Sequence, residues 1–239
     1  MIIAVLSDIH ANLEALAAVV ADARREGAGR FACLGDVVGY NADPVACVDL
    51  VRGLPCLPCI RGNHDEMAAG DRPLLGINRQ AFAAMTWTRL QLDEERRAWL
   101  GGLPLLHEEP DAAYVHASLH EPAAWHYVHD AQEAAASFAG QSPRVCFIGH
   151  SHQPGGWRDD GHGAARGQGE SFELAAGERW LVNVGSVGQP RDHDPRASYA
   201  LYDADGGRVH LRRVAYDIAA AQAKILAAGL PEQLAKRLG

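Results

Sequence analysis

Apolar residues along the first quarter of the chain form short continuous runs that alternate with segments of helical spacing. The runs cover 2–6, 31–34 and 57–60, and the helical segments between them cover 12–25 and 44–52. In the first helical segment, Leu13, Leu16 and Val20 lie three or four positions apart, which places them on one face of a helix. This alternation predicts strands of one sheet joined by crossover helices.

The rest of the chain is richer in strands. Its pattern predicts helical structure over 77–100, 130–138 and 218–238, and strands over 103–109, 112–116, 144–148, 172–174, 180–184, 199–202 and 209–214. Residues 155–170 are rich in Gly, Asp and Arg and have no periodicity, which predicts a mobile surface loop. Because neither a linker nor a repeat interrupts the chain, we expect a single domain over 1–239.

Side chains that bind metals follow five of the predicted strands. They are Asp8 and His10, Asp36, Asn63 and His64, His116, and His150 and His152. Ligands of open α/β sheets lie beyond the carboxyl ends of the strands, so we expect these side chains to share one rim. Carboxylate, amide and imidazole groups without thiolate suit Mn, Fe, Zn, Ni or Co rather than a structural zinc site. Without His64 they comprise two Asp, one Asn and four His, and these seven ligands are too many for one ion with an open position and suit two ions with a shared carboxylate.

Composition narrows the possible partners. The 239 residues are 48% apolar and 22% charged, as in an ordinary globular protein, and carry a net charge of −8. This acidic charge argues against non-specific binding of duplex nucleic acid. The N-terminus lacks a basic flank, and no apolar run reaches the roughly 20 residues of a membrane span, so we expect a cytoplasmic protein that does not contact membranes.

The five cysteines do not resemble a disulfide framework. Cys56 and Cys59 have CxxC spacing, but no second ligand pair is present for a structural zinc. We interpret them as thiols on a buried strand, with a thioredoxin-like redox role as the alternative.

Five motifs together resemble the calcineurin-like metallophosphoesterase superfamily. They are Asp8-Ile-His10, Gly35-Asp36-Val-Val-Gly39, Gly62-Asn63-His64-Asp65, Val115-His116 and Gly149-His150-Ser-His152. The stretches 183–191 and 194–199 further resemble the small bacterial single-domain members, which include phosphodiesterases and diadenosine-tetraphosphate hydrolases. The resemblance implies an α/β fold in which two mixed β-sheets pack as a sandwich flanked by helices. It also implies a dinuclear metal site at the C-terminal ends of the strands.

The resemblance further implies a role for each motif residue. Asp8, His10 and His152 would hold one metal, Asn63, His116 and His150 the other, and Asp36 would bridge them. His64 would act as general acid or stabilise the phosphoryl oxygens, and Asp65 would orient His64 by accepting its other ring proton. Ala11 stands where Gly is usual in this family, a change that we expect to be tolerated.

These implications predict a metal-dependent phosphoric ester hydrolase with two Mn, Fe, Zn or Ni ions. We hypothesise that a hydroxide bridging the ions attacks phosphorus directly, without a phosphoenzyme. The expected substrates are phosphodiesters or dinucleoside polyphosphates; the alternatives are a broad-specificity phosphomonoesterase and a non-catalytic scaffold. Predicted substrate contacts are Asn12, Arg191 and Arg196, since Arg suits phosphate. The loop 120–129, with His120, His126 and His129, either lines the cleft or is a solvated loop.

Overall fold

The computed structural model describes residues 1–71 and 73–239, and of Cys56 and Leu57 it describes only the backbone. The CxxC hypothesis depends on the side chain of Cys56, which lies outside this description. The strands are β1 (Ile2–Leu6), β2 (Arg30–Cys33), β3 (Cys56–Cys59), β4 (Leu106–Glu108), β5 (Ala112–Val115), β6 (Val145–Ile148), β7 (Gly155–Asp159), β8 (Ala164–Arg166), β9 (Ser171–Glu173), β10 (Arg179–Asn183), β11 (Ala197–Asp203) and β12 (Arg208–Val214). The helices are α1 (Leu13–Arg25), α2 (Pro44–Gly53), α3 (Asn63–Ala69), α4 (Arg79–Gln91), α5 (Glu94–Gly102), α6 (Ala131–Ala139), α7 (Ile218–Ala227) and α8 (Glu232–Lys236), with a 3₁₀ turn at Pro122–Ala124.

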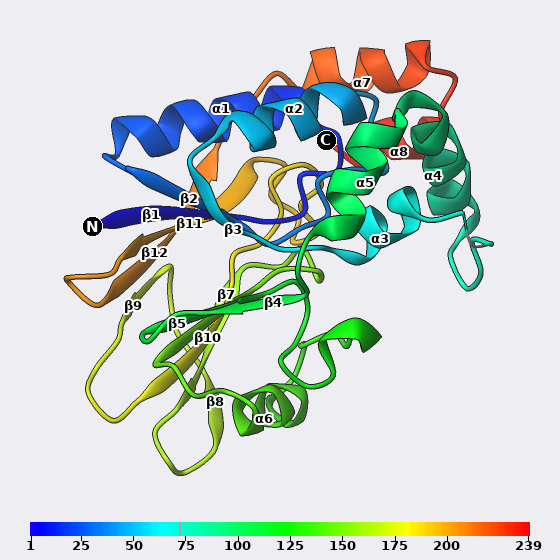
Figure 1. Ribbon diagram of the computed structural model, residues 1–239. Helices are drawn as coiled ribbons and strands as arrows, with labels where there is room; N and C mark the ends of the chain where they lie inside the picture. The colour runs from blue at the N-terminus through cyan, green and yellow to red at the C-terminus, as the bar shows by residue number, and fades with distance from the viewer. Residues whose placement is uncertain (72) are drawn as a thin grey trace.

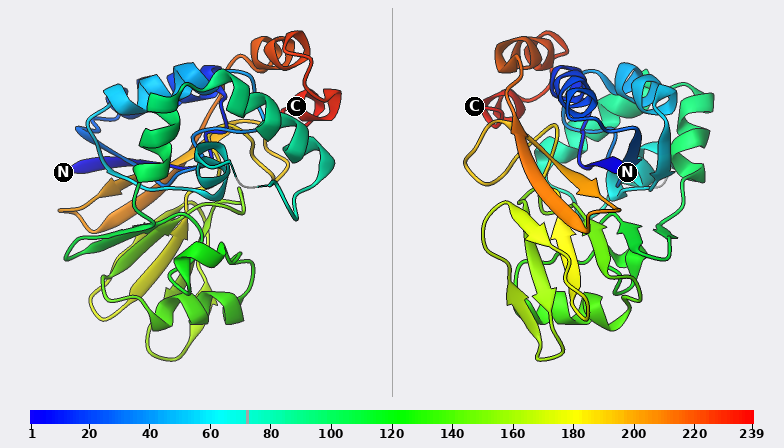
Figure 2. Two further views of the ribbon diagram at one scale, coloured as in Figure 1. Left: turned by 45° about the vertical axis from the view of Figure 1, so that its right-hand side comes forward. Right: turned by 90° about the vertical axis from the view of Figure 1, so that its left-hand side faces the viewer.

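Two six-stranded mixed sheets form the centre of the molecule. The first has the order β3-β2-β1-β11-β12-β9, with β1, β2 and β3 parallel and β11, β12 and β9 added antiparallel. The second has the order β4-β5-β6-β10-β7-β8, with β5, β6 and β10 parallel. Figures 1 and 2 show the sheets stacked face to face, with α1 and α2 on the outside of the first and α6 on the outside of the second.

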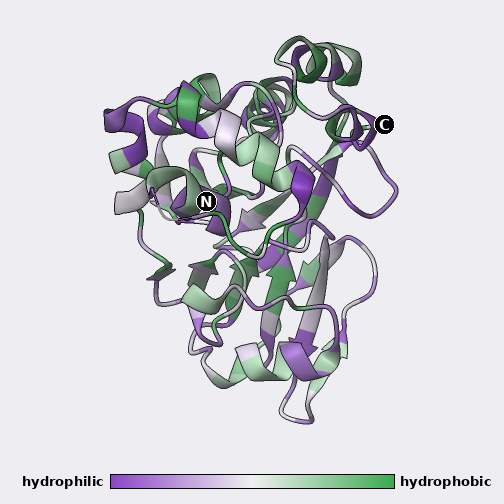
Figure 3. Cartoon of the chain, turned by 90° about the vertical axis from the view of Figure 1, so that its right-hand side faces the viewer, coloured by the Kyte–Doolittle hydropathy of each residue, from purple (hydrophilic) through white to green (hydrophobic). Residues whose placement is uncertain are grey.

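The continuous apolar runs occur because the central strands are buried on both faces. In β1, Ile3 and Val5 belong to the core between the two sheets, whereas Ala4 and Leu6 belong to the core beneath the helices. Figure 3 shows several strands as green, hydrophobic stretches joined by mostly purple or pale loops. Burial of each such aliphatic side chain contributes about 1.5–3 kcal/mol. The predicted fold class is therefore confirmed.

The structure corrects the expectations for three segments. Residues 155–170 are not a plain loop, because β7 pairs with β10 and β8 pairs with β7. The predicted helical region 77–100 is two helices, since Asp93 ends the first segment by accepting a hydrogen bond from Arg96 N and capping α5. The helix α3 was not expected at all, because it begins on residues that read as a polar loop. Among the described residues, no helix has the length and apolar character to span a membrane.

Candidate metal centre

The predicted metal ligands converge at one edge of both sheets. Asp8, Asp36 and Asn63 follow β1, β2 and β3 of the first sheet, whereas His116 and His150 follow β5 and β6 of the second. All of them except Asn63 are buried, with Asp8, His10 and His116 fully inaccessible. The centre therefore exists only where the two sheets pack together.

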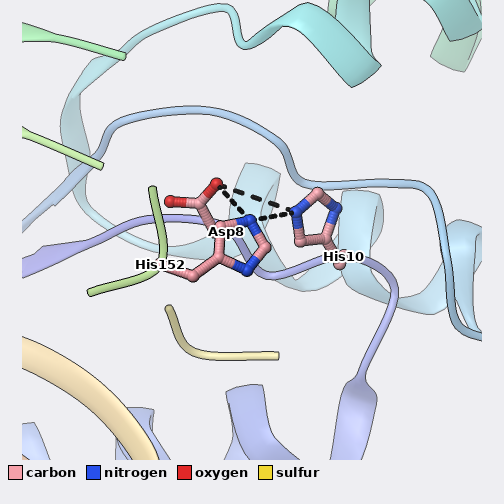
Figure 4. Close-up of side chains that lie close together, drawn as sticks. All are labelled: Asp8, His10 and His152. Carbon is pink, nitrogen blue, oxygen red and sulfur yellow. Dashed lines mark hydrogen bonds and ion pairs between the residues drawn. The ribbon is translucent and has the colours of Figure 1, made fainter. Parts of the chain in front are cut away.

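The first group consists of Asp8, His10 and His152 (Figure 4). Asp8 Oδ1 lies 3.2 Å from His152 Nε2 and 3.7 Å from His10 Nε2, and the two ring nitrogens lie 3.1 Å apart. The other carboxylate oxygen, Asp8 Oδ2, accepts a hydrogen bond from His150 N at 2.9 Å. One carboxylate oxygen is thus held by the backbone, and the other faces the histidines.

The second group joins Asp36 to ligands from the other sheet. Asp36 Oδ2 lies 3.4 Å from His116 Nε2 and 3.6 Å from His10 Nε2, so it stands between the two groups. His116 Nε2 in turn lies 3.2 Å from both Asn63 Oδ1 and His150 Nδ1. Asp36 Oδ1 accepts from His64 N at 2.8 Å, which leaves Oδ2 for the centre. This arrangement matches that of a bridging carboxylate.

Three backbone carbonyls fix the orientation of the histidines. The Nδ1 atoms of His10, His116 and His152 lie 3.1, 2.9 and 2.6 Å from the carbonyl oxygens of Val38, Leu34 and Gln189. Since a carbonyl can only accept, Nδ1 carries the proton, and Nε2 is the atom that faces the centre, where its lone pair is available whenever the ring is neutral.

These donors fit a pair of cations. Two lone pairs 3.1 Å apart cannot hydrogen-bond to each other, and within the described structure Asp8 Oδ1 is buried without a hydrogen-bond partner. A buried polar atom of this kind is costly unless a partner such as a cation satisfies it. The side chains therefore suit the two ions that the sequence predicted.

Local electrostatics keep Asp8, Asp36 and His152 in their metal-binding forms. Burial raises the pKa of the Asp8 carboxyl, but His152 and His10 outweigh burial and hold that pKa well below its usual range. The pKa of Asp36 is likewise lowered, because the neighbouring histidines outweigh burial. Burial lowers the pKa of His152 to about 4, so its ring is neutral. Burial lowers the pKa of His116 as well, but the charge of Asp36 outweighs burial and raises that pKa to about 9. Asp36 thus favours a positive charge beside it, and a metal ion would supply that charge in place of the ring proton.

The loops that carry the ligands have unusual backbone geometry. Asp8, His10, Asp36, His150 and His152 all have φ between 49° and 64°, in the left-handed region. Each such residue costs on the order of 1–3 kcal/mol, and such strain concentrates at functional sites. The stretch 183–191 braces these loops: Ser186 Oγ donates to the Asp8 carbonyl at 2.8 Å, and Asn183 Nδ2 donates to the Gly149 carbonyl at 2.7 Å.

His64 lies beside the metal ligands and lines a cavity of about 180 Å³ over the centre. Its ring packs 4.8 Å from that of His10 and 4.6 Å from that of Tyr40. Burial lowers its pKa to about 3. The predicted role of Asp65 as its hydrogen-bond acceptor is wrong: Asp65 accepts instead from the backbone of Val37, Val38 and Gly62, and His64 Nδ1 has no partner in the described structure.

The three predicted substrate contacts have different surroundings. Arg191 lines the cavity over the centre. The structure does not bring Asn12 there, because its side chain caps α1 through Ala15 N and donates to the Gly188 carbonyl. Arg196 does not line this cavity either; its guanidinium group pairs with Asp194 at 2.6 Å.

Sequence reasoning missed three aromatic residues at the centre. Tyr127 stacks on His150 at 4.2 Å, Trp125 meets His116 edge-on at 5.7 Å, and Tyr40 packs 4.7 Å from His10. Trp125 and Tyr127 lie in the loop 120–129, for which the sequence predicted a role only for the histidines. Among the histidines of this loop, His120 and His126 line a neighbouring hollow with Tyr127, whereas His129 lines a different hollow.

Comparisons with known proteins agree with this geometry. Residues 1–207 match the sequence model of the calcineurin-like phosphoesterase superfamily domain. The uncharacterized protein MJ0912 of Methanocaldococcus jannaschii is 38% identical over 99% of this chain and 96% of its own length. The crystal structure of a metallophosphoesterase from Sphaerobacter thermophilus is 42% identical, with a TM-score of 0.88 over 100% of this chain and 98% of that one. The hypothetical protein PH1004 of Pyrococcus horikoshii shares the fold at 22% identity and a TM-score of 0.79, over 99% and 97% of the two chains.

Proposed function

The chain belongs to the calcineurin-like phosphoesterase superfamily and is a metal-dependent phosphoester hydrolase, and on this premise we propose that it hydrolyses phosphodiesters or dinucleoside polyphosphates. The membership confirms the resemblance read from the five motifs.

One observation carries the choice of a diester. Two hollows adjoin the cavity over the metal centre, one of about 580 Å³ and one of about 420 Å³, and Tyr127 lines all three. A phosphorus atom held at the centre therefore has two separate hollows next to it that could each take a substituent. A monoester carries one organic substituent and would use only one of these hollows.

The residues at the centre divide the work as follows. Asp8, His10 and His152 would hold one ion, Asn63, His116 and His150 the other, and Asp36 would bind both. When bound, the ions would supply Lewis acidity that activates water and neutralises phosphoryl oxygens.

The surrounding side chains position the substrate. His64 lines the cavity beside the ligands and is placed to hydrogen-bond to a phosphoryl or leaving-group oxygen. Arg191 lines the same cavity and would bind a phosphoryl oxygen through its guanidinium group. Tyr127 stacks on the ring of His150 and Trp125 meets the ring of His116 edge-on, so both aromatic side chains border the centre.

The deciding experiment compares two chromogenic substrates on Mn²⁺-reconstituted protein. We expect kcat/KM for bis(p-nitrophenyl) phosphate to exceed that for p-nitrophenyl phosphate by at least about tenfold, which corresponds to about 1.4 kcal/mol of selective binding in the transition state. Preference for the monoester would overturn the proposal in favour of a phosphatase. Two bound metals without turnover of either compound or of diadenosine tetraphosphate would indicate a scaffold.

A further inference from the structure

The larger of the two hollows continues directly from the metal-centre cavity. Four residues, Tyr40, Asn78, Tyr127 and Arg191, line both spaces. The hollow is then extended by His193 and Arg237, which do not line the metal-centre cavity. A ligand with its reacting phosphorus at the centre would place the next part of its chain in this hollow.

Two guanidinium groups without carboxylate partners face this space. Arg191 contacts only neutral groups, with Nη2 3.2 Å from Gln189 Oε1 and 3.5 Å from the Tyr40 hydroxyl. Within the described residues Arg237 forms neither a side-chain hydrogen bond nor an ion pair. No described residue lining the hollow is acidic.

Two arginines close to this hollow do have carboxylate partners. Arg196 is paired with Asp194, and Arg213 is paired with Asp192, although both acids flank His193. In a chain with a net charge of −8, acidic partners are abundant. Arg191 and Arg237 therefore leave two guanidinium groups available in one hollow, and a phosphate group suits the donor geometry of guanidinium.

Arg237 owes its position to the C-terminal segment. It follows α8, whose Leu234 and Ala235 pack with Tyr40 and with Ala81 of α4, as the position of α8 beside α4 in Figures 1 and 2 reflects. Gln222 Nε2 of α7 donates to the Ala235 carbonyl at 3.0 Å and ties the two helices together. The superfamily match ends at residue 207, so this segment lies outside the matched residues.

We propose that the hollow is a subsite for a second phosphate of the substrate, bound by Arg191 and Arg237, and that Arg237 makes the enzyme selective for substrates with a polyphosphate chain. This inference rests on the proposed function, because it takes the scissile phosphorus to lie at the metal centre. It favours dinucleoside polyphosphates over diesters that carry a single phosphate.

The kinetic test compares kcat/KM for diadenosine tetraphosphate with kcat/KM for bis(p-nitrophenyl) phosphate, which has no second phosphate. We expect Arg237→Gln to lower the ratio of the two values by about tenfold or more, the usual size of a charge-assisted hydrogen bond. Arg237→Lys keeps the positive charge but loses the forked donor geometry of guanidinium. Its ratio should therefore lie between those of the wild type and Arg237→Gln. The matched control is Arg24→Gln, which removes an exposed arginine on α1 and should leave the ratio unchanged. An unchanged ratio in Arg237→Gln, or an equal loss on both substrates, overturns the subsite.

A binding measurement separates this inference from the proposed function. Isothermal titration of inorganic tripolyphosphate into the full-length, chelator-treated protein reports on the subsite without turnover. We expect Arg237→Gln to weaken this binding by about tenfold, with the thermal unfolding midpoint unchanged. If the wild type hydrolyses neither substrate but shows this pattern of binding, the proposed function fails and the anion subsite stands. Failure of the wild type to bind tripolyphosphate, or equal binding by both proteins, overturns the subsite.

Discussion

At the scale of single residues, His64 separates turnover from metal binding. It lies beside the predicted metal ligands. Neither of the two ligand groups described above, the one around Asp8 and the one around Asp36, includes its ring. We expect His64→Ala to lower kcat by about 10²–10⁴-fold, because the substrate oxygen loses a positioned donor. Metal content, measured by plasma mass spectrometry, should stay at the wild-type value.

The control for this variant is His162→Ala, which removes an exposed histidine between β7 and β8. Its kcat and metal content should equal those of the wild type. If His64→Ala lost metal in proportion to its activity, His64 would be a ligand, a role that its proximity to His10 and Asp36 also permits.

Single-residue roles were predictable from the sequence where chemistry alone determines them. The sequence predicted that Asp36 and His116 lie close together, as they do, because both side chains follow strands and few other functions suit that pattern. The contacts of Asp65 and Arg196 were not predictable, because neighbouring groups decide them. Asp65 accepts a hydrogen bond from the backbone of Val37, and Arg196 pairs with Asp194. Asn12 was open to a better interpretation, because an Asn just before a helical pattern is a frequent N-cap.

At the scale of elements, the turn after β6 depends on a residue without a side chain. A Cβ at Gly149 would collide with Ser7 Oγ and with Asp8 Oδ2, the oxygen that His150 N binds. We expect Gly149→Ala to displace Asp8, lower the free energy of unfolding by about 1–3 kcal/mol, and reduce metal content. Chemical denaturation and metal analysis measure the two effects.

Gly53 provides the matched control for this substitution. It lies at the end of α2, and a Cβ there would meet nothing within 4 Å. Gly53→Ala should leave metal content unchanged and stabilise the protein by up to about 1 kcal/mol. Wild-type metal content in Gly149→Ala would show that the loop relaxes without disturbing Asp8.

Element boundaries were predictable where burial leaves a clear apolar pattern in the sequence and not where pairing with a distant strand decides. The run 2–6 gave β1 because both faces of that strand are buried. Residues 155–159 form a strand because β10 supplies a partner and because Gly156 leaves space for Phe172 and Trp180. Neither cause is visible in the local sequence.

One buried carboxylate joins α1 to the first sheet and gives a pH prediction. Asp22 Oδ2 accepts from the Tyr199 hydroxyl at 2.7 Å and from Arg212 Nε at 2.9 Å. Burial raises the pKa of Asp22, but these two donors outweigh it, so the pKa lies below its usual value. The carboxylate therefore stabilises the fold above its unfolded pKa of about 3.9, and this contribution is lost as the pH falls through the lower folded value.

We expect Asp22→Asn to lower the free energy of unfolding by about 1–3 kcal/mol at pH 7, with the difference from wild type shrinking below about pH 4. Urea denaturation at pH 7, 5 and 3 measures this. The control is Asp111→Asn, whose carboxylate is 72% exposed and whose removal should have little effect at any pH. A deficit for Asp22→Asn that stays constant with pH would show that its charge does not stabilise the fold.

At the scale of the whole molecule, the metal centre joins the two sheets. The first sheet supplies Asp8 and Asp36 and the second supplies His116 and His150, so bound ions would add a further link between elements that also meet through apolar packing and hydrogen bonds. The sequence predicted the ligands and the sandwich, but not which strands form which sheet. That depends on late strands: β11 pairs with β1, nearly 200 residues earlier in the chain.

This placement predicts that metal removal destabilises the entire fold. Ions that bind only the native state stabilise it by about 2.7–4.1 kcal/mol at 100–1,000 times their dissociation constant. For a chain of this size we therefore expect chelation to lower the midpoint of thermal unfolding by about 5–15 °C. Because we propose that the chain folds as one domain, a single calorimetric transition should shift as a unit.

Asp36→Asn tests whether this shift arises at the proposed centre. The substitution keeps the shape of the side chain but removes the charge that faces both His10 and His116. If Asp36 holds both ions, the variant binds metal weakly, and adding a chelator to it changes the midpoint by no more than about 2 °C. A shift as large as that of the wild type would place the stabilising ions elsewhere. A wild-type midpoint that does not change on chelation would show that apolar packing and the hydrogen bonds between the sheets hold them together without the ions.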